Sequence, residues 1–108
     1  MSGKLVQINF KFNVPRRDYE QAVSPLAGEI AAVAGLHWKV WLMNEAESEA
    51  GGIMLFTDEA SAMAYLDGPV VAQITGHPAL SDFSVKLFDV LKDETVITHG
   101  PIKERAEA

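Results

Sequence analysis

The segment from Leu36 to Phe56 constrains the fold more than any other, because two apolar stretches flank a short polar turn. The stretches LHWKVWLM and GGIMLF are rich in aromatic and β-branched residues, which favours neighbouring antiparallel strands. Both tryptophans of the chain, Trp38 and Trp41, lie in the first of these strands. Their odd spacing sends them to opposite faces of a regular strand, so we expect both faces of the sheet to be covered.

Alternating patterns predict two further strands, from Lys4 to Phe12 and from Ser84 to Val90. Before the hairpin, apolar residues recur at helical spacing and Asp18 is a candidate cap. Pro25 lies inside that pattern, so either one helix kinks there or Ser24 caps a second helix.

Glycine and proline mark the remaining boundaries. Gly35 is expected to end the first helical segment in the left-handed conformation. After the hairpin, Thr57 or Asp58 caps a helix that stops at Gly68, and Pro69 opens another helical turn, which Gly76 closes.

The predicted order, β-α-β-β-α-β, is that of a ferredoxin-like α+β sandwich with both helical segments on one face of the sheet. We expect one domain over residues 1–108, in which residues 91–108 form a C-terminal arm with frayed last residues. Large apolar side chains fall on both faces of the hairpin, and a monomer would leave one set exposed. The sequence therefore predicts a homodimer whose sheets pack face to face.

Composition excludes several classes of protein. With no cysteine, the chain has no disulfide, thiolate metal site or cysteine nucleophile. The net charge of −6 opposes binding to nucleic acid, which relies on basic residues that displace counterions. No stretch approaches the ~20 apolar residues of a membrane span or has the form of a signal peptide. These observations predict a cytoplasmic protein with no membrane or nucleic-acid partner.

The sequence resembles the YdhR-type monooxygenases of the dimeric α+β barrel superfamily. The resemblance rests on INFKFNVP, SPLAGEI, LHWKVW, the EAGG turn with its LFTDE continuation, VKLFDV and ETVITHGP, and it covers Leu5 to about Pro101. It implies a homodimeric barrel with a pocket between sheet and helices in each subunit. It also implies kinship with oxygenases that oxidise aromatic phenols with dioxygen and without a cofactor, although a shared fold alone does not fix function.

Such an oxygenase holds an electron-rich ring, favours its deprotonated form and keeps water out. Aromatic side chains are the natural walls of that slot, with Trp41 as the first choice and Trp38 as the second. Taken alone, each of them fits a role in the core or in an interface better than a role in a pocket. The aromatic candidates are Trp38, Trp41, Phe56 and Tyr65.

The polar candidates are fewer. Asn9 or Asn13 would orient the substrate through an amide hydrogen bond, and a half-buried Lys39 would lower the pKa of a bound phenol. His77, in a loop before Pro78, is the preferred base among three histidines, and His99 lies in the arm. No histidine pair has helical ligand spacing, so we expect no metal site. The resemblance to cofactor-independent oxygenases implies that no cofactor is bound.

Three alternatives remain. The same order of elements occurs in the RNA-recognition motif, but its stacking aromatics are absent and the charge is unfavourable. A haem-binding or haem-degrading relative would need a proximal histidine on a helix, which His77 fits only loosely. A dimer that binds a small ligand without turnover fits the sequence as well as an enzyme does. The sequence favours a cofactor-independent monooxygenase that acts on an aromatic or quinol-like molecule.

Overall fold

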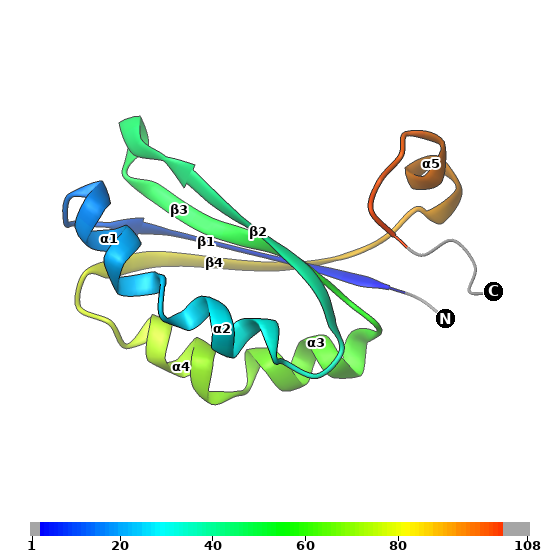
Figure 1. Ribbon diagram of the computed structural model, residues 1–108, viewed down its shortest axis with the longest axis horizontal. Coiled ribbons are helices and arrows are strands. Elements are labelled where there is room, and N and C mark those ends of the chain that lie inside the picture. Colours follow the sequence, from blue (N-terminus) through cyan, green and yellow to red (C-terminus); the bar gives the residue numbers. More distant parts are fainter. Residues whose placement is uncertain (1–2, 103–108) are drawn as a thin grey trace.

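The computed structural model describes residues 3–102 as a four-stranded antiparallel sheet with helices along one face (Figure 1). The strands lie side by side in the order β2-β3-β1-β4, and all three pairings are antiparallel. This is the predicted ferredoxin-like α+β fold, with the tryptophan-bearing hairpin as β2 and β3. The strands are β1 (Lys4–Phe12), β2 (Leu36–Asn44), β3 (Glu49–Phe56) and β4 (Leu80–Asp89).

Each crossover between strands consists of two short helices rather than one long helix. The first contains α1 and α2 and the second contains α3 and α4, and all four lie on the same side of the sheet (Figure 1). A 3₁₀ turn, η1 (Glu45–Glu47), joins the strands of the hairpin. The helices are α1 (Arg16–Val23), α2 (Leu26–Ala31), α3 (Glu59–Leu66), α4 (Pro69–Thr75) and α5 (Lys92–Ile97).

The break in the first crossover follows the second of the two predicted alternatives. α1 ends before Ser24, and α2 begins after Pro25, which occupies the N-cap position expected for Ser24. The prediction that Asp18 caps the first helix is wrong. α1 begins at Arg16 because Pro15 already holds a φ of −58°, and this leaves Asp18 inside the first turn.

Most of the other boundary residues behave as the sequence predicts, but Gly35 does not end a helix, because the C-cap of α2 is Ala32. Gly35 has a left-handed φ of +83°, although α2 ends four residues before it. Asp58, rather than Thr57, caps α3, and its Oδ1 accepts a hydrogen bond of 2.9 Å from the Ser61 amide. Gly68 precedes α4, which begins at Pro69.

Two segments differ from the prediction. β4 begins at Leu80, four residues before the predicted start, because a bulge opposite Asn9–Lys11 and a left-handed Asp82 disturb the alternation there. The arm contains a helix, α5, which the sequence did not suggest. In Figure 1, β4 leads directly into α5 at the end of the sheet near the N-terminus. The predicted fraying of the last residues concerns 103–108, which lie outside the described residues.

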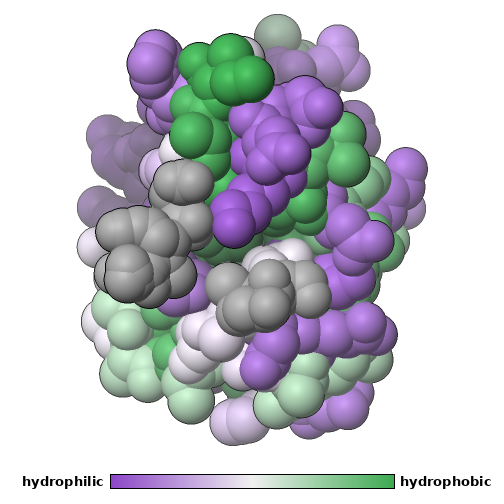
Figure 2. Space-filling model, turned by 90° about the vertical axis from the view of Figure 1, so that its right-hand side faces the viewer, coloured by the Kyte–Doolittle hydropathy of each residue, from purple (hydrophilic) through white to green (hydrophobic). Residues whose placement is uncertain are grey.

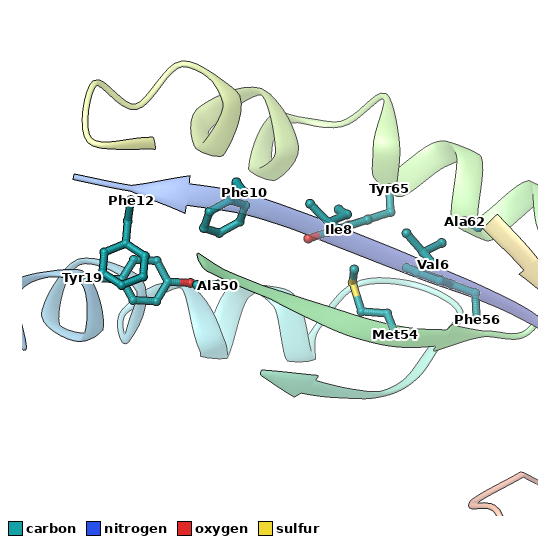
Figure 3. Packing of buried hydrophobic residues seen from close by; sticks show 10 residues of the cluster. All are labelled: Val6, Ile8, Phe10, Phe12, Tyr19, Ala50, Met54, Phe56, Ala62 and Tyr65. Atoms are coloured by element: carbon teal, nitrogen blue, oxygen red, sulfur yellow. The ribbon is translucent and has the colours of Figure 1, made fainter. Parts of the chain in front are cut away.

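The face of the sheet that carries α1–α4, the helix-covered face, holds the core. The alternate residues of β1 that begin at Val6 point to this face, and Met54 and Phe56 of β3 join them (Figure 3). Val6 and Phe56 are fully buried. The cluster of buried residues consists of Val6, Ile8, Phe10, Phe12, Tyr19, Ala50, Met54, Phe56, Ala62 and Tyr65.

The opposite face, the open face, is apolar at the end near the arm and becomes more polar toward the hairpin turn, and among residues 3–102 the arm covers it at one end. There Leu5, Trp38 and Leu55 form a hollow with α5, and the indole Nε1 of Trp38 donates a hydrogen bond of 2.7 Å to the carbonyl of Pro101. Phe88, which pairs with Leu5 in the same row, is still 45% exposed, and Val40 in the next row is 52% exposed. Figure 2 looks onto the end that carries α5 and shows hydrophobic surface at the level of that helix.

Candidate functional site

Lys39 and Trp41 lie next to each other on the helix-covered face of β2. The register pairs Lys39 with Met54 and Trp41 with Gly52, both of which belong to that face. Gly52 has no side chain to fill the space, and a Cβ there would come within 2.6 Å of Lys39 Cε. Lys39 therefore lies across β3 with its ammonium 3.6 Å from the centre of the Trp41 ring.

The lysine is held in an apolar setting. Burial lowers the pKa of Lys39 to about 8, because the charged amine loses water. The cation–π contact with Trp41 favours the charged form and offsets part of that effect. Within residues 3–102, none of the ion pairs involves Lys39. Its charge is thus available to a ligand at the helix-covered face.

Beside Lys39 a small void separates the sheet from the helices. Its volume is about 20 Å³, and its walls include Lys39, Trp41 and two tyrosines, Tyr19 and Tyr65. Tyr65 is 5% exposed, and its hydroxyl has no hydrogen-bond partner in the described part of the chain. Burial raises the pKa of Tyr65, and it raises the pKa of Tyr19 to about 12, so both hydroxyls are proton donors at neutral pH.

Two larger hollows share walls with this void. The first, of about 320 Å³, lies between α1, the start of α2 and β2, and Trp41 forms one wall of it. Arg16 stands at its rim, where Glu20 and Glu45 hold it in ion pairs of 2.8 and 3.2 Å. The second, of about 230 Å³, lies between α1, α2 and α4. Tyr19 and Val23 line both hollows and the void, so the three spaces meet at these residues.

His77 lies at the second hollow, and Asn13 contacts the loop that carries it. His77 lines it from the loop after α4, and its Nδ1 accepts a hydrogen bond of 3.1 Å from the Ala79 amide. The side-chain amide of Asn13 donates to the carbonyl of Pro78 at 3.5 Å, so it ties β1 to the same loop. Both side chains are exposed.

Three of the residues predicted for the site lie elsewhere. Trp38 is on the open face under the arm, and Asn9 is on the same face, where its amide donates to Glu49 at 3.3 Å. Phe56 is fully buried and packs against Tyr65 with ring centres 5.6 Å apart, so it supports the void without lining it. The structure therefore brings Lys39, Trp41 and Tyr65 together and separates them from Trp38 and Asn9.

Two residues of the site were absent from the sequence prediction. Tyr19 lines all three spaces and stacks on Phe12 with ring centres 5.2 Å apart. Its spacing of four from Val23 extends the apolar stripe of the first helix by one turn, which is the signal that identifies it. Gly52 entered the sequence prediction only as part of the GGIMLF strand, although a glycine inside a strand often marks a close approach of another group to the backbone.

A ferredoxin-like sheet with an aromatic cavity between one face and its helices is a recurrent architecture among small-molecule enzymes and binding proteins. The sequence from residue 5 to residue 101 matches the family described as "Putative mono-oxygenase ydhR". The chain belongs to this family. The resemblance stated from the sequence motifs is thereby confirmed. No curated protein matches the chain.

Solved structures show the same fold at low sequence identity. A protein of unknown function, NE2512 from Nitrosomonas europaea, matches with a TM-score of 0.72, 19% identity and coverage of 84% of this chain and 91% of the other. SnoaB from Streptomyces nogalater, a cofactor-independent oxygenase, matches with a TM-score of 0.68, 18% identity and coverage of 83% and 94%. The heme-degrader MhuD from Mycobacterium tuberculosis matches with a TM-score of 0.63, 19% identity and coverage of 81% and 95%.

Across residues 3–102, none of the helices is both long and apolar enough to cross a membrane.

Proposed function

We propose that this chain is a cofactor-independent monooxygenase that oxidises an aromatic, phenol- or quinol-like molecule with dioxygen at the helix-covered face. The observation that carries the proposal is the pairing of Lys39 with Trp41, 3.6 Å from ammonium to ring centre, at a void that Tyr65 also lines. Membership of the monooxygenase family and the likeness to SnoaB support the same reaction class.

The reaction needs no electrons from the protein. In an anthrone-like substrate, the methylene carbon between two aryl rings loses two hydrogens and gains one oxygen atom as a carbonyl. The second oxygen atom of O₂ leaves as water, so the substrate itself is the reductant. The rate then depends on how readily the substrate ionises, because its anion is the species that gives an electron to oxygen.

Lys39 and Trp41 promote the ionisation of the substrate in this proposal. Trp41 stacks against the substrate ring in the first hollow, and the Lys39 ammonium lowers the pKa of the substrate oxygen through its positive charge. The apolar walls strengthen this interaction because they keep water away from it. The charge is present below about pH 8, where Lys39 is protonated.

His77 and Asn13 act at the other opening in this proposal. His77 removes the proton of the substrate carbon through the second hollow, and Asn13 fixes the loop from which it acts. This role is separable from that of Lys39, because His77 lines the second hollow whereas Lys39 lines the void.

The open face serves assembly in this proposal. Val40 and Phe88 are exposed large apolar residues on a face that carries further apolar side chains from β1 and β3. A second copy that packs sheet to sheet would cover them and form a homodimer in the cytoplasm. Trp38 and Asn9 then lie at the seam and not in the pocket.

Oxygen uptake by the metal-stripped protein tests the proposed reaction. Uptake is measured with a panel of anthrones and hydroquinones in the presence of chelator. Lys39→Met and Trp41→Phe are expected to lower kcat/KM at least tenfold, and His77→Ala to lower kcat. Lys86→Met and Trp38→Phe are the matched controls, since Lys86 and Trp38 lie on the open face. Uptake that stays at the buffer rate with every substrate contradicts the proposal.

A ligand-binding dimer without turnover is the second candidate. The observation that favours it is the exposed, loop-borne position of the only proposed base, His77. Saturable ligand binding without oxygen uptake would establish it. A haem site is not part of either proposal, because His77 follows α4 in a loop and the two tryptophans lie on opposite faces of the sheet.

A further inference from the structure

The small void on the helix-covered face has two sides of different chemistry. Leu26, Ile74 and Leu80 line both the void and the second hollow. Apart from the two residues that line all three spaces, the void shares Trp41 with the first hollow. The side of the void toward the second hollow is therefore aliphatic, whereas the side toward the first hollow carries the tryptophan.

The second hollow is apolar inside and polar at its rim. Val14 and Ala22 add to its aliphatic walls. Its carboxylate, amide and imidazole groups belong to Asp18, Gln73 and His77, which are all exposed. Apolar spaces in proteins take up small, weakly hydrated molecules such as xenon. A hollow of about 230 Å³ with such walls therefore favours an uncharged apolar ligand.

The proposed reaction has two reactants of very different size, and the spaces differ in the same way. The void of about 20 Å³ has room for one molecule of the size of water or dioxygen, but it is too small for an aromatic ring. A ring that stacks on Trp41 fills the first hollow and closes that side of the void. The second hollow then remains open to the void. Dioxygen is small, uncharged and apolar, so it matches the walls of this second approach.

We infer that dioxygen binds in the second hollow, against Leu26, Ile74 and Leu80, and enters the void from there. The inference rests on the proposed function and assigns its second reactant a binding site of its own. His77 stands at the rim of the same hollow. In the proposed reaction, dioxygen therefore arrives on the side from which the proton of the substrate carbon leaves. The first hollow selects the aromatic substrate, and the second hollow admits the gas.

Methyl NMR spectra of the protein under oxygen and under nitrogen test this site without turnover. Dissolved dioxygen is paramagnetic, so it speeds the relaxation of the methyl groups that it approaches. Leu26 is expected to respond more strongly than Ile30, which is buried on the same helix but lines none of the three spaces. Ile8, which lines the void, is likewise expected to respond more strongly than Val6 on the same face of β1 (Figure 3).

Two exposed alanines allow each hollow to be filled separately. Ala22 of α1 lines the second hollow, and Ala27 of α2 lines the first. Ala22→Trp is expected to reduce the response of Leu26 to oxygen and to raise KM for dioxygen about fivefold, with KM for the aromatic substrate unchanged. Ala27→Trp is the matched control. It is expected to raise KM for the aromatic substrate and to leave KM for dioxygen and the response of Leu26 unchanged.

The response of Leu26 is separable from the oxygen-uptake experiment. Equal responses of Leu26 and Ile30, or an unchanged KM for dioxygen in Ala22→Trp, would overturn the inference even if the protein consumes oxygen. Loss of the response of Leu26 when 2-naphthol binds, a phenol of the proposed substrate class, would place the aromatic ligand in the second hollow and overturn it as well. A selective response that Ala22→Trp removes, without oxygen uptake on any substrate, would support the dioxygen site and reject the oxygenase.

Discussion

The two faces of the sheet carry the same kinds of side chain, but these side chains have different surroundings. Each carries one tryptophan from β2, yet Trp41 stands at a cavity with a desolvated lysine and Trp38 is bound to the backbone of the arm. The difference comes from what covers each face. Helices leave spaces between their side chains and the sheet, whereas on the open face, within residues 3–102, the arm covers one end and Val40 and Phe88 stay about half exposed. This difference is the basis of our proposal that the first face binds a ligand and the second serves assembly.

The largest expected effect distinguishes two adjacent glycines of β3. A Cβ on Gly51 would overlap the carbonyl oxygen of Ile8, a backbone atom that cannot move without separating β3 from β1. Gly51→Ala is expected to prevent stable folding, with a loss above ~4 kcal/mol. Gly52→Ala mainly meets the end of the flexible Lys39 side chain, so it is expected to fold, with weaker ligand binding. Urea unfolding followed by circular dichroism measures both, and equal stability of the two variants would contradict the assignment.

Phe56 tests whether a predicted site residue is a core residue. Phe56→Ala is expected to lose about 3–5 kcal/mol of unfolding free energy, because the side chain is fully buried. Phe56→Leu is expected to keep most of the stability and the full affinity for 2-naphthol. A tenfold loss of affinity in a stable Phe56→Leu protein would instead identify Phe56 as a ligand contact.

Val40 tests the role of the open face. Val40→Asp places a charge on a face where sheet-to-sheet packing would bury it, and the dimer is expected to weaken by more than tenfold. Light scattering over a dilution series measures the change in mass. Met63→Asp, at an exposed position on α3, is the control and is expected to leave the mass unchanged. A parent protein that is monomeric at micromolar concentration would reject the dimer altogether.

Lys39 has the smallest expected effect on stability, and this effect depends on pH. At pH 7 the folded and the unfolded protein both carry the charged lysine, but only the folded state suffers its desolvation. Lys39→Met is therefore expected to be more stable than the parent by about 1 kcal/mol. The gain is smaller than the full desolvation cost, because the variant loses the cation–π contact and because Lys39 is partly exposed in the parent.

The sign of the pH dependence follows from the lowered pKa. As the pH rises through about 8, folded Lys39 loses its proton, whereas the unfolded lysine keeps its proton up to its ordinary pKa of 10.5. The parent protein is thus expected to gain stability relative to Lys39→Met between pH 8 and 10.5. Lys86→Met, on the open face, is expected to show no such change. If the difference in unfolding free energy between the parent and Lys39→Met stays constant with pH, Lys39 is fully hydrated in the folded protein.

The sequence predicted the fold well because its strongest signals are local. Alternation specifies β1, and the tryptophan-bearing apolar stretch specifies β2. Glycine and proline residues mark the bounds of α3 and α4. The helix α5 was missed, because its short sequence KDETVI carries one apolar pair and no capping signal.

The site was predicted less completely, because it depends on which face each side chain reaches. Sequence spacing separates Trp38 from Trp41 but does not say which of them faces the helices. The register shift between Leu36 and Trp38 and the pairing of Trp41 with Gly52 settle that question only in three dimensions. The unpaired hydroxyl of Tyr65 is likewise a property of its neighbours and has no signature in the sequence.

A fluorescence titration of two single-tryptophan proteins with 2-naphthol tests the division between the two faces most directly. In Trp38→Phe the remaining Trp41 lines the cavity, and in Trp41→Phe the remaining Trp38 lies under the arm. We expect saturable quenching in Trp38→Phe and none in Trp41→Phe. Saturable quenching of Trp38 alone would place the ligand on the open face and contradict the account.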